Sequence, residues 1–285
     1  MTQAQQFLER MRPLQEERVR AARARRSIAA LEALAGKRAA PQDFAAALRR
    51  QDAGPVRLIA EVKKASPSAG SIREGDPLFF ARAMAGGGAA AISVLTEERF
   101  FKGSLDDLAR IAAGVPVPVM RKDFLIDPYQ LLEARAAGAA AALLIVAMLA
   151  DAELATMLRE AAGLGLTALV EVHDRPELER ALAAGAGVVG INNRNLQTLK
   201  VDTETTYLLR ALVPAGVIVV SESGQRTRAD LDRLAAAGVD AVLIGEAIMR
   251  AGDVEGKVRE LLGTTVNPYL EAEMLKRLRE GGMQN

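Results

Sequence analysis

The sequence predicts an α/β protein in which a (β/α)8 barrel follows an N-terminal helical extension. From residue 57 onwards, short and almost continuously apolar runs alternate with Ala- and Leu-rich helical patterns, as is typical of parallel strands covered by helices. Segments made of a helix, a glycine turn and a strand recur about every 50 residues, so that each interval holds two βα units. Eight such units in about 210 residues favour a closed TIM barrel. The competing architecture, a doubly wound open sheet, is disfavoured because VKKASPSAG and not GxGxxG follows the first strand.

The N-terminal helical extension is expected over residues 1–52, packed on the barrel. Apolar residues recur at helical spacing over residues 7–34, and we expect Gly36 to end the first helix. Pro41 is expected to begin a short second helix that ends at Leu48.

The barrel itself is expected over residues 53–262. Its strands are predicted at 57–62, 90–95, 117–121, 141–146, 168–172, 188–191, 218–221 and 241–244. Its helices are predicted near 77–86, 104–112, 128–137, 151–162, 176–184, 203–213, 227–237 and 253–262. Residues 263–285 predict a C-terminal helical tail with Leu270, Met274 and Leu278 on one face, which packs on the barrel, dimerises or stays loose.

Composition and charge exclude several classes of function. A formal net charge of +1 argues against a polycationic nucleic-acid binder. The chain has no Cys and one His, so disulfides and Cys- or His-rich metal sites are excluded, and we expect no metal. The longest apolar stretch has about 13 residues, too few to span a membrane. Because the N-terminus also lacks the apolar core of a signal peptide, we expect a cytoplasmic protein.

Charged and polar residues gather at the C-terminal ends of the predicted strands, where (β/α)8 barrels place their active sites. The set comprises Glu61, Lys63, Lys122, Glu171, Asn192, Arg194, Glu222 and Ser223. Glu61 and Lys63 are two residues apart, so their side chains can point to the same side of the strand. Any one of these charges is explained equally well by a strand that ends at the surface. Together they predict a site of mutually shifted pKa values that is suited to acid–base catalysis.

Glycines and small residues after the last two predicted strands indicate a phosphate site. SESG (221–224) follows one strand, and Gly245 follows the other. In barrels these two loops often bind phosphate through backbone N–H groups and a helix N-terminus. Glycine lets the backbone approach the anion closely.

The chain resembles the indole-3-glycerol phosphate synthase family in segments that occur in the family's order. They are IAEVKKASPSAG (59–70), ISVLTEERFFKGSLDDL (92–108), MRKDFLIDPYQLLEARAAGA (120–139), ALLIVAML (142–149), LVEVHD (169–174), GINNRNLQTLKVD (190–202), VSESG (220–224) and LIGEAIMR (243–250). The resemblance implies a carboxy-lyase of tryptophan biosynthesis. Its substrate would be 1-(2-carboxyphenylamino)-1-deoxyribulose 5-phosphate, which closes a ring and loses CO2 and water, with no cofactor.

The resemblance also implies roles for the site residues. Lys122 matches the general acid that protonates the attacked carbonyl, and Glu171 and Lys63 match the base and the acid of dehydration. The division of the two lysines between the steps stays open. The residues that match substrate-binding positions are Glu61, which orients a lysine, Ser66 and Arg194 for the anionic groups, Phe101 and Leu143 for the anthranilate wall, and Asn192 and Glu222 for the sugar hydroxyls. The phosphate cup matches Ser223, Gly224, Gly245 and the backbone N–H of Glu246, whose carboxylate we expect to point away from the phosphate.

Two other functions are weighed against this reading. Another phosphate-binding barrel, such as an Amadori-type isomerase, often lacks two lysines at this position. A nucleic-acid or membrane-surface binder is motivated by seven arginines of the first helix: Arg10, Arg12, Arg18, Arg20, Arg23, Arg25 and Arg26. Nearby glutamates offset that charge, and arginine is also a good helix former, so we expect no nucleic-acid or membrane partner. We expect His173 at the surface or behind the site and not as a catalyst, and the protein as a monomer or weak homodimer.

Overall fold

Eight parallel strands close into a barrel in the computed structural model, which describes residues 5–50, 54–67, 69–195, 198 and 200–264. Going round the barrel, the strands are β1 (Arg57–Val62), β10 (Ala241–Ile244), β9 (Ile218–Glu222), β8 (Val188–Asn192), β7 (Thr167–Val172), β6 (Ala141–Ile145), β5 (Val119–Lys122) and β4 (Ala91–Leu95). The barrel closes at β1, where Ile59 is in register with Leu243 of β10 and with Ala91 of β4. The predicted (β/α)8 fold is confirmed, and each strand lies within two residues of its expected bounds.

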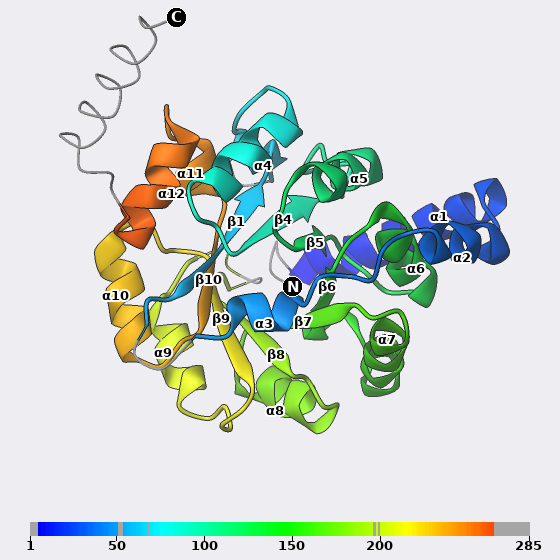
Figure 1. The fold of residues 1–285 in the computed structure, drawn as a ribbon. Helices are drawn as coiled ribbons and strands as arrows, with labels where there is room; N and C mark the ends of the chain where they lie inside the picture. Colours follow the sequence, from blue (N-terminus) through cyan, green and yellow to red (C-terminus); the bar gives the residue numbers. More distant parts are fainter. Residues whose placement is uncertain (1–4, 51–53, 68, 196–197, 199, 265–285) are drawn as a thin grey trace, which may run out of the picture.

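Helices surround the barrel on its outer side (Figure 1). They are α4 (Pro77–Gly86), α5 (Leu105–Gly114), α6 (Pro128–Ala137), α7 (Asp151–Gly163), α8 (Arg175–Ala183), α9 (Glu204–Arg210), α10 (Arg228–Ala236) and α12 (Val254–Leu262). The sequence did not predict three short elements that also follow strands. These are the hairpin of β2 (Ala65–Ser66) and β3 (Gly70–Ser71), the 3-10 helix η1 (Val146–Met148), and α11 (Glu246–Met249). The face of the predicted tail helix, Leu270 to Leu278, lies outside the described residues.

Side-chain caps fix where several of these helices begin. The side chains of Asp76, Ser104, Asp127, Asp174, Thr227 and Asp253 each accept a hydrogen bond from a backbone N–H of the helix that follows. Such caps typically contribute about 1 kcal/mol each. They also fix the ends of the loops that precede these six helices.

The core has two layers, because successive strand residues point to opposite faces. One layer fills the inside of the barrel and includes Ile59, Met120, Leu143, Leu169 and Val220. The other layer lies between the strands and the helices and includes Leu58, Ile92, Leu144, Val170 and Val219. The interior is therefore packed with side chains, and a ligand site is confined to one end of it.

Among the described residues, the N-terminal extension contains three helices. The predicted helix ends at Gly36 and Leu48 are confirmed, but the single first helix and the start at Pro41 are wrong. The expected first helix is divided into α1 (Gln5–Arg25) and α2 (Ile28–Gly36), because Ser27 is extended and its side chain caps α2 at Ala30. Pro41 does not begin the next helix. Asp43 caps α3 (Phe44–Leu48) by accepting the N–H of Ala46.

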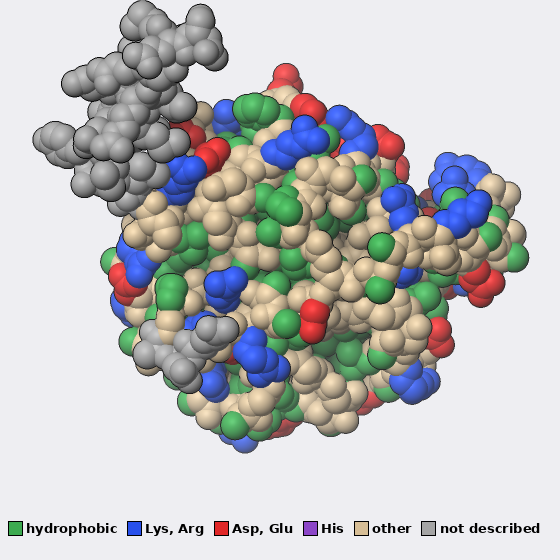
Figure 2. Space-filling view, viewed as in Figure 1, with side chains coloured by type: hydrophobic (Ala, Val, Ile, Leu, Met, Phe, Trp, Pro, Cys, Tyr) green, Lys and Arg blue, Asp and Glu red, His purple; other side chains and the backbone are tan. Residues whose placement is uncertain are grey.

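Helix α3 closes the end of the barrel at which the strands begin. Phe44 and Leu48 are fully buried in the inner core layer. Arg57, the first residue of β1, donates to the carbonyl oxygen of Ala47. In Figure 1, α3 lies over the centre of the barrel. Figure 2 shows this face with Lys and Arg side chains spread among acidic and apolar groups.

Helix α1 packs at the opposite end, which we call the mouth because the carboxyl ends of the strands meet there. Arg18 of α1 forms an ion pair of 2.8 Å with Asp123, which follows β5, and donates to the carbonyl oxygen of Thr96, which follows β4. Arg12 donates to the carbonyl oxygen of Met148, which follows β6. The arginines singled out in the sequence thus include two that attach α1 to the mouth. None of the described helices is long and apolar enough to cross a membrane.

Candidate active site

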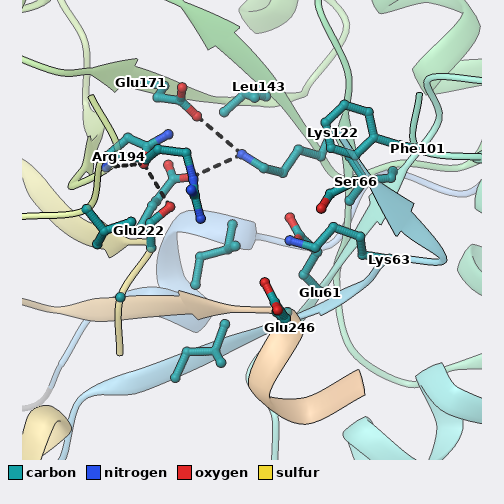
Figure 3. Close-up of a pocket in the computed structure, with 18 of the residues that line it drawn as sticks. Glu61, Lys63, Ser66, Phe101, Lys122, Leu143, Glu171, Arg194, Glu222 and Glu246 are labelled. Atoms are coloured by element: carbon teal, nitrogen blue, oxygen red, sulfur yellow. Dashed lines mark hydrogen bonds and ion pairs between the residues drawn. The ribbon is translucent and has the colours of Figure 1, made fainter. Parts of the chain in front are cut away.

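A pocket of about 1110 Å³ opens at the mouth of the barrel, and every residue predicted for the site lines it. These residues are Glu61, Lys63, Ser66, Phe101, Lys122, Leu143, Glu171, Asn192, Arg194, Glu222, Ser223, Gly224, Gly245 and Glu246. They come from all eight strands of the barrel or from the loops that follow them. Figure 3 shows most of them converging on one space.

Lys122 lies at the centre of the charged part of the pocket. Its Nζ is 3.2 Å from Glu171 Oε2 and 3.0 Å from Glu222 Oε2, so strands β5, β7 and β9 meet through one ammonium group (Figure 3). Both carboxylates are almost fully buried. A cation bound by two buried carboxylates is held in place and kept charged.

Lys63 and Glu61 form a second charged pair beside the first. Lys63 Nζ lies 2.6 Å from Glu61 Oε1, which confirms that these residues point to the same side of β1. Lys63, Lys122 and Glu171 therefore line the same pocket. The predicted juxtaposition of two lysines and the glutamates is confirmed.

The pKa values in the cluster move in different directions. Burial alone would lower the pKa of Lys122, but the negative charges of Glu222 and Glu171 outweigh it and raise the pKa above its ordinary value. Burial would raise the pKa of Glu171, yet Lys122 and His173 hold it well below its ordinary value. For Glu222, burial and repulsion from Glu171 outweigh the attraction of Lys122 and raise the pKa to about 7. Neighbouring groups with pKa values driven apart are typical of acid–base sites.

Two glycines make the space that the carboxylates occupy. A Cβ at Gly245 would stand 2.4 Å from Glu61 Oε1, and a Cβ at Gly190 would stand 2.2 Å from Glu222 Oε1. Any larger residue would therefore displace a carboxylate. Sequence reasoning assigned Gly245 only to phosphate binding and missed Gly190, whose closeness to Glu222 depends on the pairing of β8 with β9.

The loop after β9, where the phosphate site is predicted, has a left-handed backbone at two consecutive residues. Ser223 has a φ of 65° and Gly224 a φ of 103°, so two consecutive residues adopt the left-handed region. Ser223 is held there because its Oγ donates to Asn192 Oδ1 (2.9 Å) and its carbonyl oxygen accepts from Asn193 (2.9 Å). Strain of this kind in a residue other than glycine is typical of functional sites.

Positive charge surrounds this loop beyond what the sequence predicted. Arg226 and Arg250 line the same pocket, and so does Arg10 of α1. Arg250 Nε lies 2.9 Å from Glu246 Oε1, so a guanidinium offsets that carboxylate. The expected orientation of the Glu246 carboxylate relative to a bound phosphate stays a prediction. The sequence did contain a signal for Arg226, because this cationic residue lies only two positions after SESG (221–224).

An apolar wall faces the charged cluster. Phe101 and Leu143 lie in it as predicted, and Leu8, Phe124 and Ile145 extend it. The rings of Phe101 and Phe124 have centroids 6.2 Å apart, a distance typical of packed aromatic pairs. The pocket therefore has an apolar wall, a charged cluster and the left-handed loop after β9 in its lining.

Comparisons with known proteins agree with this geometry. A family model described as indole-3-glycerol phosphate synthase matches residues 8–261. The indole-3-glycerol phosphate synthase of Roseiflexus castenholzii is 53% identical over 232 residues, which cover 78% of this chain and 86% of that protein. The enzyme of the same name from Mycobacteroides abscessus is 49% identical over 242 residues, which cover 85% and 88%.

Solved structures with the same fold are more distant in sequence. A 3-hexulose-6-phosphate synthase from Salmonella typhimurium has a TM-score of 0.60 at 15% identity, over 73% of this chain and 98% of that one. A thiamine phosphate pyrophosphorylase from Pyrococcus furiosus has a TM-score of 0.55 at 17% identity, over 73% and 94%. At these identities the likeness concerns the fold alone.

Proposed function

The chain belongs to the indole-3-glycerol phosphate synthase family, and from this premise we propose how its pocket acts on 1-(2-carboxyphenylamino)-1-deoxyribulose 5-phosphate. The reaction is that of a carboxy-lyase in tryptophan biosynthesis and yields indole-3-glycerol phosphate, CO2 and water. The observation that carries the proposal is the position of Lys122 between Glu171 and Glu222, in a pocket shared with Lys63.

The two ends of the substrate would bind at opposite parts of the pocket. The phosphate would accept hydrogen bonds from backbone N–H groups at Gly224, Gly245 and Glu246 and from the hydroxyl of Ser223. The anthranilate ring would lie on Phe101 and Leu143, and its carboxylate would be placed with the help of Ser66 and Arg194. An apolar wall suits a step that removes a carboxylate, because loss of charge as CO2 is favoured in a dry site.

The sugar hydroxyls would be bound by Asn192 and Glu222. Glu222 Oε1 is buried against Gly190 and has no hydrogen-bond partner among the described residues, so it would accept from a hydroxyl once the carboxylate turns toward the substrate. An unpaired buried oxygen costs about 1–3 kcal/mol, and a substrate hydroxyl would relieve that cost on binding.

Ring closure needs a proton donor at the sugar carbonyl. The aromatic carbon that bears the carboxylate forms the new bond to the carbonyl carbon, and Lys122 gives a proton to the carbonyl oxygen as it becomes a hydroxyl. Loss of CO2 then returns its bonding electrons to the ring. Glu171 and Glu222 hold Lys122 charged before this step, which favours its role as donor.

Dehydration needs a base and an acid. Glu171 would take a proton from the intermediate while a lysine ammonium protonates the departing hydroxyl, so that water leaves and the indole ring becomes aromatic. Lys63, oriented by Glu61, is the second acid of the pocket.

The direct test is turnover of the ribulosyl anthranilate, followed by the appearance of indole absorbance and CO2. We expect the wild-type protein to form indole-3-glycerol phosphate, whereas an Amadori-type isomerase would release no CO2. Lys122→Met keeps the unbranched apolar stem without the ammonium group and should lower kcat by about 10²–10⁴-fold, the usual contribution of a general acid. Lys37→Met, at an exposed lysine after α2, is the matched control and should keep wild-type activity.

Two outcomes contradict the proposal. A wild-type protein that does not convert this substrate excludes the proposed reaction. A Lys122→Met protein that keeps more than about a tenth of wild-type kcat excludes Lys122 as the acid. Thermal unfolding of both variants separates loss of chemistry from loss of fold.

We also propose that the protein is a monomer or a weak homodimer in the cytoplasm. The most exposed large apolar side chains among the described residues, Leu208 and Phe79, belong to different helices, α9 and α4. Isolated exposed apolar residues are normal on monomers. Light scattering coupled to size exclusion tests this, and a stable higher oligomer would contradict it.

A further inference from the structure

We infer that His173, anchored by Glu177, is a positioning residue for Glu171: its imidazolium fixes the Glu171 carboxylate and keeps it ionised after Lys122 has given up its proton. This inference rests on the proposed function for the catalytic role of Glu171. It concerns a buried residue that the proposed mechanism does not otherwise use.

The geometry places His173 directly behind the catalytic carboxylate. His173 Nε2 lies 3.1 Å from Glu171 Oε1, while the other oxygen of that carboxylate faces Lys122. The Glu171 carboxylate therefore lies between two basic side chains, Lys122 on the substrate side and His173 behind it. The contact with His173 has the distance of an ion pair without the alignment of a full hydrogen bond.

A second carboxylate holds the other side of the imidazole. Glu177 of α8 lies 2.9 Å from His173 Nδ1, and the same oxygen accepts the backbone N–H of His173. Asp174, between them in sequence, caps α8 by accepting the N–H of Glu177. The helix cap thus places Glu177, Glu177 fixes the imidazole, and the imidazole faces Glu171.

The two contacts together favour the charged form of the ring. A neutral imidazole has one N–H and one lone pair, so one of its nitrogens would place a lone pair beside a carboxylate oxygen. Two carboxylates, 3.1 Å from Nε2 and 2.9 Å from Nδ1, favour the imidazolium, which carries a positive charge and an N–H on each nitrogen. Burial would lower the pKa of His173, but Glu171 and Glu177 outweigh it and raise the pKa to about 10, in agreement with the geometry.

No other carboxylate among the described residues forms an ion pair with the imidazole. On β7, the strand that His173 follows, the charged neighbour is Glu171, and on α8 it is Glu177. The element η1, which packs against both β7 and α8, consists of Val146, Ala147 and Met148. The charge state of His173 is therefore set by two carboxylates.

This arrangement matters at one point in the reaction. When Lys122 protonates the substrate, its ammonium becomes neutral and Glu171 loses the cation on its substrate side. A buried carboxylate with no cation takes up a proton readily, and a protonated Glu171 is unable to act as the base of dehydration. His173 keeps a positive charge beside Glu171 during that interval.

The chain contains a single histidine, so NMR of histidine-labelled protein reports on this residue alone. We expect both ring nitrogens of His173 to be protonated at neutral pH, with no titration near 6.5. In Glu177→Gln the midpoint should fall by at least about one pH unit, because one carboxylate is lost. A neutral imidazole in the wild-type protein at neutral pH overturns the inference whatever the activity, and an unchanged midpoint in Glu177→Gln overturns the anchoring by Glu177.

The kinetic test compares the pH dependence of kcat in His173→Gln and in the wild-type protein. Glutamine keeps a hydrogen-bonding group but no charge, so the acidic loss of kcat should move to higher pH by at least about one unit, and activity below that limit should fall about tenfold for each unit. A merely structural role would lower kcat by the same factor at every pH, and that result overturns the inference.

Glu179→Gln is the matched control on the same helix, because Glu179 is exposed and pairs with Arg175 at the surface. Its kcat profile and its His173 resonances should remain those of the wild-type protein. If Glu179→Gln moves either of them as far as Glu177→Gln does, the specific role of Glu177 is overturned. Wild-type turnover with a neutral His173 would refute this inference while leaving the proposed function intact, whereas an inactive wild-type protein with a charged His173 would refute the proposed function.

Discussion

At the scale of single residues, the acid–base cluster depends on two glycines, whose lack of a side chain leaves space for neighbouring carboxylates. Gly190 and Gly245 leave room for Glu222 and Glu61, and neither glycine has the positive φ that would explain its presence by backbone conformation. Their importance is therefore steric and can be separated from effects on the backbone.

Gly190→Ala should inactivate the enzyme without unfolding it. The new methyl group would stand 2.2 Å from Glu222 Oε1 and 2.6 Å from a methyl carbon of Leu169, so Glu222 has to leave its contact with Lys122. We expect kcat to fall by at least about tenfold, measured by indole formation, because misplaced catalytic groups are costly. Gly187→Ala, just before the same strand and with open space around its added Cβ, should remain active. Equal activity of the two variants would show that the space at Gly190 is not needed.

Glu171→Gln should stall the reaction before water is lost. Glutamine has nearly the same shape but cannot take a proton, so ring closure and decarboxylation should continue and dehydration should slow by about 10²–10⁴-fold. Mass spectrometry of quenched reactions should detect the hydroxylated intermediate. Normal turnover with no such species would contradict the role of Glu171 as base.

The site residues could largely be predicted from the sequence, because each one follows a strand whose apolar pattern is clear. Lys122 and Glu171 are examples, since the barrel alone brings the ends of their strands together. Gly190, Arg226 and Arg250 were missed, because their roles depend on contacts through space that no local pattern records. His173 was predicted to lie behind the site, but its link to Glu177 requires the fold of α8.

At the scale of elements, α1 is attached to the mouth by charged groups. Arg18 shares Asp123 with the fully buried Arg121, and Asp123 also accepts a hydrogen bond from the hydroxyl of Thr96. The pKa of Asp123 is held below its ordinary value: burial would raise it, but Arg121 and Arg18 outweigh burial. This network connects the N-terminal extension to the carboxyl ends of β4 and β5.

Arg18→Ala should destabilise the protein by about 1–3 kcal/mol, the usual cost of leaving a buried charged group without one of its partners. The cost stays moderate because Arg121 still pairs with Asp123. Urea unfolding measures this difference. Arg20→Ala, at an exposed position on the same helix, should change the free energy of unfolding by less than about 0.5 kcal/mol. Equal effects of the two substitutions would exclude a specific role of the Asp123 contact.

The bounds of the strands could be predicted from the sequence more accurately than those of the N-terminal helices, and the reason is physical. Strands buried on both faces are apolar throughout, and this pattern is independent of their neighbours. The break between α1 and α2 depends on Ser27 acting as a cap in the middle of a helical pattern, and the start of α3 depends on Asp43 in place of Pro41. Caps of this kind compete with the continuation of a helix, and tertiary packing decides between them.

At the scale of the whole molecule, the stability should fall as the solution becomes alkaline. His173 has its pKa raised from 6.5 to about 10 in the folded protein, so the folded chain keeps a proton that the unfolded chain releases. This contribution is complete below pH 6.5 and is lost as the pH rises through about 10. Between about pH 7.5 and 9.5 the free energy of unfolding should fall by up to about 1.4 kcal/mol per pH unit. Urea unfolding of the wild-type protein and of His173→Gln tests this, because equal slopes would contradict the raised pKa.

The N-terminal extension contacts both ends of the barrel. Helix α3 closes the end where the strands begin, and α1 packs at the mouth, where Leu8 and Arg10 line the pocket. The extension thus contributes both to the core and to the wall of the site. Its removal should therefore affect stability and substrate binding together.

The pairing of β1 with β10 joins the first and the last strand of the barrel, which are synthesised at very different times. Until residues 241–244 have emerged, the growing polypeptide has two open sheet edges, one at β1 and one at the last strand made. Unpaired edges invite association with other chains. A chain that ends before residue 241 would therefore expose both of these edges to other chains.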